Sequence, residues 1–138
     1  MTQISTEQAE NIDGSVAARN RLTAALLVED PTPGFWVMVE DGFFARWIPE
    51  VIEMQMEQDP IHHHKDVLAH TFAVTKSSPP ELRVRFAALM HDIGKPATRR
   101  FGPGGVTFHH HEAVGARITL QRLSKMGFDD LLTEQVAK

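Results

Sequence analysis

The heptapeptide Leu89-Met90-His91-Asp92-Ile93-Gly94-Lys95 is the most informative part of the sequence. It follows an apolar run from Leu82 that is too uniformly apolar for a surface helix, so we expect this run to lie inside the protein. His91 and Asp92 place an imidazole and a carboxylate side by side at its buried end. Because buried polar groups are costly unless they are paired or bind a cation, the pair predicts a metal site. Gly94 is expected to end the helix, and Pro96 to prevent it from restarting.

The composition is that of one ordinary domain. The 138 residues are 42% hydrophobic, include no cysteine and carry a formal net charge of -4. The lack of cysteine excludes disulfides, zinc fingers and thiol catalysis, and the acidic balance gives no bulk reason to expect this chain to bind nucleic acid. No run approaches the roughly 18 apolar residues of a membrane span, and the N-terminus is unlike a signal peptide. We therefore expect a cytoplasmic protein without membrane association.

Hydrophobic periodicity predicts an all-α fold, a helical bundle. Helices are expected at residues 16–29, 35–40, 66–76, from the proline pair at 79–80 to His91-Asp92, at 112–126, and from Asp129 or Asp130 onward. Asp30 to Gly34 reads as a break, and aromatic residues from Phe43 to Trp47 are expected to pack in the core. A short β-hairpin is expected near residues 100–108. Residues 1–55 are expected to form a helical neck or connector, and residues 56–138 the main domain.

The turn between two of these helices controls the geometry of the site. His70 lies about seven residues before the turn at residues 77–80, and His91 about eleven residues after it. With a rise of roughly 1.5 Å per residue, an antiparallel helix pair brings His70 within about one turn of His91 and Asp92. Two imidazoles and a carboxylate suit a divalent ion such as manganese, iron, nickel, cobalt, zinc or magnesium. Taken alone, His70 would also fit a half-buried helix histidine bonded to a carbonyl.

The other histidines extend the site on both sides, since all eight lie between positions 62 and 111. His62 and Asp66 share the helical face of His70, and they are expected to bind substrate or orient a ligand; Asp66 would also serve as a helix N-cap. His111 opens the 112–126 helix, where Gly115 permits close approach, and it is expected to bind a second metal or a phosphate. His63 and His64 are expected in solvent or in a merely local role. At most one of His109 and His110 is expected to share the direction of His111.

Basic residues follow the central heptapeptide. Lys95 lies three residues after Asp92 and is expected to act with His91 and Asp92 in catalysis, by neutralising charge on a phosphate. Arg99 and Arg100 are expected to bind the substrate. The alternative is a solvated basic loop.

These motifs resemble a known family. His70, the run from His91 to Lys95, and the run from Phe108 to Ala116 are similar to the HD superfamily of metal-dependent phosphohydrolases, in its HDIG form. The stretch from Asp66 to Thr71, with Gly42-Phe43-Phe44 and Ile48-Pro49-Glu50, resembles the bacterial tRNA nucleotidyltransferases and the related poly(A) polymerase family. The resemblance covers about residues 15–138.

The resemblance implies that His70, His91 and Asp92 ligate a metal, and that His111 joins them in two-metal members. It also implies a distal aspartate ligand on a later helix. Asp129 and Asp130 read as helix caps, so we expect the chain to be a piece of a longer protein, truncated before that ligand, and to retain metal weakly. The implied substrates are phosphomonoesters or cyclic phosphodiesters of nucleotides or RNA ends, with tRNA bound through the full-length protein.

Three functions are compatible with the sequence. The domain is a metal-dependent phosphohydrolase within a tRNA nucleotidyltransferase or poly(A) polymerase-type protein, a scaffold that contacts tRNA with little hydrolysis, or a free-standing nucleotide phosphohydrolase. A homodimer is also compatible with the sequence.

Overall fold

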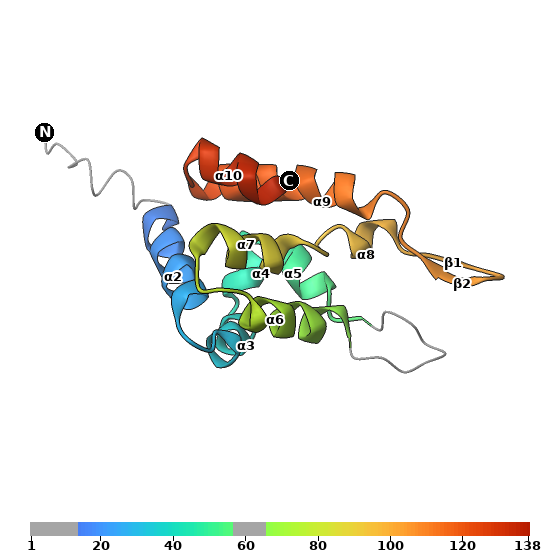
Figure 1. Cartoon of the computed structure of the whole chain (residues 1–138), viewed down its shortest axis with the longest axis horizontal. Coiled ribbons are helices and arrows are strands. Elements are labelled where there is room, and N and C mark those ends of the chain that lie inside the picture. Colours follow the sequence, from blue (N-terminus) through green and yellow to red (C-terminus); the bar gives the residue numbers. More distant parts are fainter. Residues whose placement is uncertain (1–13, 57–65) are drawn as a thin grey trace, which may run out of the picture.

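The computed structural model describes residues 14–56 and 66–138, and helices dominate both ranges. The helices are α2 (Ser15–Leu27), α3 (Thr32–Glu40), α4 (Phe43–Trp47), α5 (Pro49–Glu53), α6 (Val67–Ser77), α7 (Leu82–Met90), α8 (Lys95–Thr98), α9 (His111–Met126) and α10 (Asp130–Ala137). Strands β1 (Arg100–Gly102) and β2 (Gly105–Thr107) form an antiparallel hairpin that extends from the helical body (Figure 1). The predicted all-α bundle with a short hairpin is confirmed. Within these ranges no helix is both long and apolar enough to cross a membrane.

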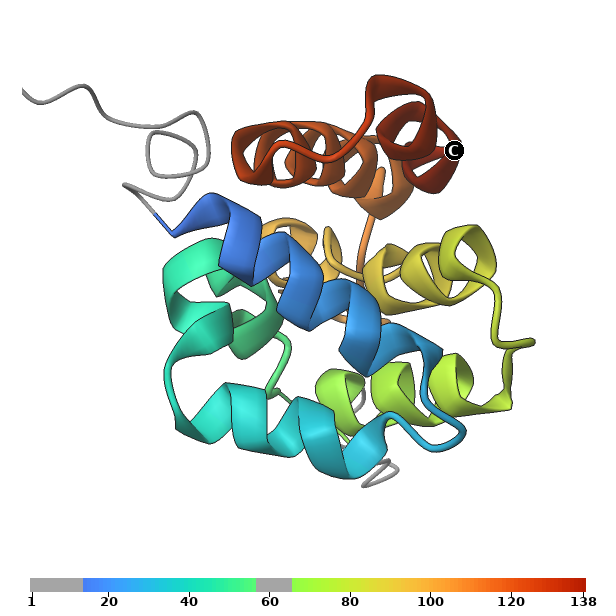
Figure 2. The ribbon, with the colours of Figure 1, turned by 90° about the vertical axis from the view of Figure 1, so that its left-hand side faces the viewer.

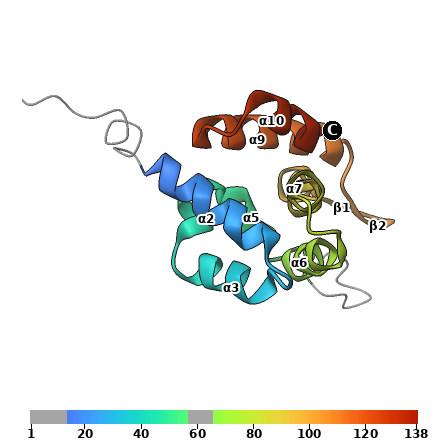
Figure 3. The ribbon, with the colours of Figure 1, turned by 60° about the vertical axis from the view of Figure 1, so that its left-hand side comes forward.

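Helix α7 occupies the middle of the bundle. It packs against α6, α10 and α2, and Figure 3 looks nearly along it, with α9 and α10 on one side and α6 on the other. Phe86, Leu89 and Met90 are buried on this helix. The expected interior position of the run from Leu82 is confirmed, and the end of α7 carries the central heptapeptide into the core.

Capping residues define the ends of several helices. The Asp66 side chain caps α6 by accepting the Ala69 N–H at 2.7 Å, and Asp129 caps α10 by accepting the Leu132 N–H at 3.2 Å. Gly127 ends α9 in the left-handed conformation, with φ of 83°. For Asp66 and for the start of the last helix, the capping alternative is the one that the structure adopts.

Aromatic side chains join the first helices to α6. The ring centroid of Phe35 lies 6.3 Å from that of Phe44 and 5.0 Å from that of Phe72, and all three residues are fully buried. Phe43 and Trp47 are buried as well, so the prediction of core packing for these aromatics is confirmed.

Figure 2 shows α2 crossing the face of the bundle that is turned toward the viewer.

A buried arginine joins α2 to α7. The guanidinium of Arg85 donates to the carbonyl oxygens of Leu26, Val28, Glu29 and Ser78, and the residue is only 3% exposed. These carbonyls end α2 and α6, where the last helical carbonyls have no partner within the helix. One cationic side chain therefore satisfies the ends of two helices that flank α7.

Helix α3 begins earlier than its hydrophobic pattern predicts. It starts at Thr32 instead of Phe35, because Pro33 fits the first turn of a helix, where no N–H donor is needed. The Asp30 carboxylate also accepts the Thr32 N–H at 3.0 Å. The predicted break over residues 30–34 is therefore wrong after Pro31.

The expected role of Gly94 is also wrong. Helix α7 already ends at Met90, Gly94 has a right-handed φ of -81°, and α8 restarts the helix at Lys95 with Pro96 in its first turn. Glycine is required here by close packing: a Cβ at Gly94 would collide with the carbonyl oxygen of His111 and lie 2.7 Å from the Gly115 nitrogen. The start of α9 thus rests directly on the backbone that follows His91 and Asp92, as Gly115 predicted.

Candidate metal centre

The helix hairpin of α6 and α7 brings the three predicted ligands together. His70 comes from α6, and His91 and Asp92 come from the turn after α7. One ligand atom from each residue lies within 4.8 Å of the others, and the ring centroids of the two histidines are 6.3 Å apart. The convergence that helix arithmetic predicted is therefore present.

Asp92 lies at the centre of the charged groups. Its Oδ2 is 3.1 Å from His91 Nε2 and 3.3 Å from Lys95 Nζ, and its Oδ1 is 3.6 Å from His111 Nε2. Asp92 is only 5% exposed, so every one of these groups meets the carboxylate close to the core.

His91 is less buried than the sequence predicts. Its side chain is 37% exposed, whereas that of Asp92 is 7% exposed. The expectation that both would be buried side by side is wrong for His91: the two side chains meet, but in the turn after α7 only that of Asp92 lies in the core. An exposed imidazole beside a buried carboxylate leaves the cluster accessible from solvent.

Backbone carbonyls orient two of the imidazoles. Nδ1 of His91 lies 2.5 Å from the Ala88 carbonyl oxygen, and Nδ1 of His111 lies 3.2 Å from that of Phe108. In this arrangement each Nδ1–H donates to a carbonyl, and each Nε2 faces Asp92. Metal-binding histidines commonly hold their second nitrogen in this way, which fixes the tautomer and the ring orientation.

The donor set fits a divalent metal ion. His70, His91 and Asp92 offer two nitrogens and one carboxylate oxygen, a mixed set suited to borderline divalent cations. With Nδ1–H of His91 donated to Ala88, its Nε2 lone pair would face the Asp92 carboxylate at 3.1 Å. Two acceptors at that distance repel one another unless a proton or a metal ion lies between them. Three protein ligands also leave coordination positions for water and substrate.

The electrostatics of the cluster are consistent with this picture. Burial raises the pKa of Asp92, but the imidazole of His91 and the ammonium of Lys95 outweigh it and lower the pKa to about 2. The hydrogen bond to Asp92 raises the pKa of His91, against the opposing effect of burial. In the metal-free protein, Asp92 therefore favours the protonated form of His91.

Metal affinity is expected to fall at low pH. Because the pKa of His91 is raised, a metal ion must displace the proton of His91 below that pKa, whereas Asp92 remains ionised down to about pH 2. Below the raised pKa of His91, metal affinity should fall at least about tenfold for each pH unit, because at least one proton must be released on binding. Calorimetric titration with nickel(II) between about pH 6 and pH 8 measures this dependence. A dissociation constant that is constant across this range would contradict it.

The predicted basic residues occupy two different places. Lys95 is nearly buried beside Asp92, and its Nζ lies 5.2 Å from the centre of the Phe108 ring, a contact that the sequence did not reveal. Arg99 and Arg100 instead lie at the base of the hairpin, where the guanidinium of Arg100 donates to the Arg99 carbonyl oxygen. The structure thus places Lys95, but neither arginine, within the charged cluster around Asp92.

Each of the remaining candidates either lies away from the cluster around Asp92 or falls outside the residues that the structure describes. Asp66 uses one carboxylate oxygen to cap α6. His62, His63 and His64 lie outside the described residues. His109 and His110 are both exposed.

His110 has a local role that the sequence did not indicate. It has φ of 63°, the only positive φ of a non-glycine residue in the described ranges, and it precedes the first residue of α9. This left-handed residue turns the chain so that His111 enters the helix facing Asp92.

Substitution of His110 by valine is expected to lower the free energy of unfolding by about 1–2 kcal/mol, since β-branched residues strongly disfavour the left-handed region. Denaturant titration measures the effect. His109→Val is the matched control, because the neighbouring histidine is also exposed and lacks a positive φ. Equal losses in the two variants would contradict the role assigned to the backbone of His110.

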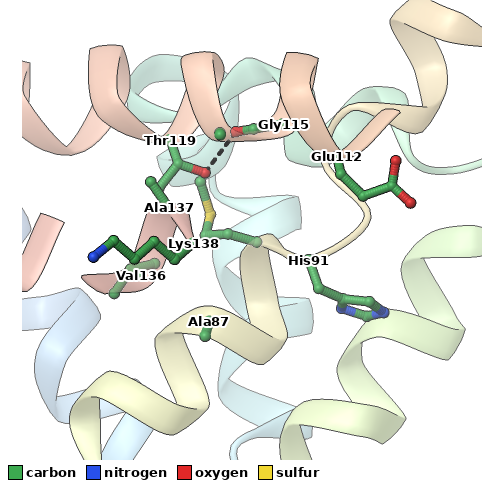
Figure 4. A pocket seen from close by; sticks show the side chains of 10 residues that line it. Ala87, His91, Glu112, Gly115, Thr119, Val136, Ala137 and Lys138 are labelled. Atoms are coloured by element: carbon green, nitrogen blue, oxygen red, sulfur yellow. Dashed lines mark hydrogen bonds between the residues drawn. The ribbon is translucent and has the colours of Figure 1, made fainter. Parts of the chain in front are cut away.

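A cavity reaches the cluster from the side of α9 and α10. It has a volume of about 240 Å³, and His91, Glu112 and Thr119 are among its lining residues. Figure 4 shows the His91 ring and the Glu112 carboxylate at the same side of this cavity. Glu112 was not predicted as a site residue, and its position next to His111 was the only signal in the sequence.

A helical bundle in which a helix hairpin presents two histidines and an aspartate defines a candidate metal-binding domain. The chain belongs to the HD domain family, whose model matches residues 61–138. This confirms the resemblance seen in the sequence.

The chain is also similar to tRNA nucleotidyltransferases. It is 33% identical over 115 residues to the A-adding tRNA nucleotidyltransferase of Deinococcus radiodurans, an alignment that covers 78% of this chain and 26% of that protein. It is 32% identical over 126 residues to the CC-adding tRNA nucleotidyltransferase of Thermus thermophilus, covering 86% and 29% of the two chains. The multifunctional CCA protein of Teredinibacter turnerae is 33% identical over 129 residues, covering 86% and 30%. The chain thus spans less than a third of the length of these relatives. No solved structure matches it significantly.

Proposed function

We propose that this chain is a metal-dependent phosphohydrolase domain that acts on phosphomonoesters or cyclic phosphodiesters of nucleotides or RNA ends. It would act as part of a larger cytoplasmic protein of the tRNA nucleotidyltransferase and poly(A) polymerase type. The observation that carries the proposal is the convergence of His70, His91 and Asp92, with ligand atoms within 4.8 Å of one another.

The surrounding residues suit the hydrolysis of a phosphoester. A divalent metal held by His70, His91 and Asp92 would lower the pKa of a bound water toward about 7 and so make hydroxide available. Asp92 is placed to accept a hydrogen bond from that water with the oxygen that does not ligate. Lys95 and His111 lie on the two sides of the Asp92 carboxylate, where they can bind phosphate oxygens and stabilise their negative charge.

The relatives support a substrate that is RNA. Two of them are named for the addition of nucleotides to tRNA and the third is a multifunctional CCA protein, and this chain aligns with about a quarter to a third of each. In a protein of that kind, an HD domain would meet the ends of tRNA, which carry phosphates or cyclic phosphates when cleaved. The tRNA would then be bound mainly by parts of the larger protein outside this chain.

A second candidate is a scaffold that contacts tRNA with little hydrolysis. The names of the relatives favour it, because they mention nucleotide addition and no hydrolysis. The two candidates differ in whether the His70, His91 and Asp92 cluster must bind metal for the domain to function.

Hydrolysis of p-nitrophenyl phosphate and bis(p-nitrophenyl) phosphate with added manganese or nickel distinguishes the two candidates. His91→Ala is expected to abolish hydrolysis, whereas His109→Ala, which removes an exposed histidine outside the cluster, should retain the wild-type rate. Wild-type rates in both variants, or no metal-dependent hydrolysis by the wild type, would exclude the enzymatic proposal.

A further inference from the structure

The hairpin next to the candidate metal centre carries an exposed aromatic side chain. Phe101, in the middle of β1, is 68% exposed and pairs through its backbone with Val106. Each of the other phenylalanines and tryptophans in the described ranges is buried or half-buried. The guanidinium carbon of Arg99 lies 5.0 Å from the centre of the Phe101 ring, a cation–π contact that holds the two side chains together in solvent.

This aromatic side chain lies in a locally basic segment of an acidic chain. Residues 95–111 contain Lys95, Arg99, Arg100 and three histidines but no aspartate or glutamate, although the whole chain has a net charge of -4. Arg100 is exposed on the same strand as Phe101. The hairpin therefore offers a flat apolar ring bordered by positive charge, which complements a polyanion with aromatic groups.

We propose that Phe101 and Arg99 form a binding site for single-stranded RNA, with one base stacked on the Phe101 ring and an adjacent phosphate next to the Arg99 guanidinium. The inference rests on the proposed function and names its substrate as a strand instead of a mononucleotide. Aromatic stacking combined with arginine contacts is the usual means by which proteins bind single strands without sequence preference.

The position of the hairpin relative to the metal centre supports a strand as the ligand. Phe101 follows Lys95 by six residues, so it lies at most about 20 Å from Lys95 along the chain. A strand whose terminal phosphate reaches Lys95 would place one of its next few nucleotides on the hairpin. A single exposed ring is too little apolar surface for insertion into a membrane, whereas it matches the size of one base.

Fluorescence polarisation with a labelled oligoribonucleotide of about eight residues tests this site in metal-free buffer, so the result is independent of hydrolysis. Phe101→Ala is expected to weaken binding about fivefold or more, the low end of the loss of one stacked base. Because Phe101 is exposed, the fold should be unaffected, which circular dichroism verifies. Arg99→Ala should reduce the slope of log K against log salt by about 0.7, the contribution of one phosphate contact on a single strand. Arg100→Ala should reduce the slope less, because neighbouring residues of a strand point to opposite faces.

Two matched controls and a conservative variant complete the test. Leu131→Ala removes a side chain of similar exposure, 62%, from α10, and Arg83→Ala removes an exposed cation from α7; both should bind as the wild type does. Phe101→Trp should retain affinity, and its indole fluorescence should be quenched when the oligonucleotide binds.

Unchanged binding by Phe101→Ala, or equal binding of a duplex of the same sequence, would overturn the stacking site. Binding that depends on Phe101 but occurs only to vesicles of phosphatidylserine and phosphatidylcholine would also overturn it. If binding of the single strand depends on Phe101 while His91→Ala shows no effect on hydrolysis, the RNA site stands and the phosphohydrolase proposal fails.

Discussion

Asp92→Asn is expected to reduce the affinity for nickel(II) by at least about 100-fold and to abolish metal-dependent hydrolysis, because it removes the only carboxylate of the ligand set. It should also destabilise the metal-free protein by about 2 kcal/mol at neutral pH, the equivalent of lowering the pKa of a carboxyl from 3.8 to about 2. Calorimetric titration measures the first effect and denaturant unfolding the second.

The pH dependence identifies the origin of the lost stability. Because the pKa of Asp92 is depressed, its contribution is fully present above about pH 4 and is lost as the pH falls through about 2. Wild type and Asp92→Asn should therefore converge in stability in strong acid. Asp130→Asn is the matched control, since it neutralises an exposed aspartate on α10 and should alter stability by no more than about 0.5 kcal/mol. Wild-type metal affinity in Asp92→Asn would contradict the ligand assignment.

Gly94→Ala is expected to lower the free energy of unfolding by about 3 kcal/mol, near the upper end of the usual cost of overpacking. The added Cβ meets the carbonyl oxygen of His111 and the nitrogen of Gly115, and neither backbone atom can rotate away as a side chain would. The first turn of α9 must therefore move, which separates His111 from Asp92. Thermal and denaturant unfolding measure the cost.

Two other glycines provide a graded comparison. A Cβ at Gly115 would lie 3.4 Å from the Gly94 nitrogen, a tight contact, whereas one at Gly34 in α3 would meet nothing within 4 Å. Gly115→Ala should thus cost less than Gly94→Ala, and Gly34→Ala should stabilise the protein by about 0.5–1 kcal/mol through helix propensity. Three variants of equal stability would show that the contact between the chain after α7 and the start of α9 is not tight.

The convergence of His70, His91 and Asp92 could be predicted because it depends on local geometry. The positions of His70 and His91 relative to one turn determine how two antiparallel helices align, and this arithmetic requires no knowledge of distant packing. The close approach at Gly115 was predictable for a similar reason, since this small residue lies one helical turn after His111, on the same face of α9.

Features that depend on contacts between distant segments could not be predicted. Gly94 was expected to end a helix. A glycine in a sequence can mark either a positive φ or a close approach of two backbones, and the sequence alone does not distinguish them. The exposure of His91 follows from the end of α7 at Met90, beyond which helical periodicity no longer gives side-chain direction. The contact of Lys95 with the Phe108 ring and the exposure of Phe101 both depend on where the hairpin lies.

The hydrogen bonds of Arg85 cross the predicted boundary between the connector and the main domain. Three of its four carbonyl acceptors belong to residues 26–29, within the segment predicted as a connector, and the fourth to Ser78. A protein shortened to begin at residue 56 would leave the buried cation of Arg85 with one acceptor, Ser78. Arg85 lies on α7, the helix whose end carries His91. The boundary at 55/56 stays a prediction, but removing the first helices would take away the hydrogen bonds that hold the helix leading into the candidate metal centre.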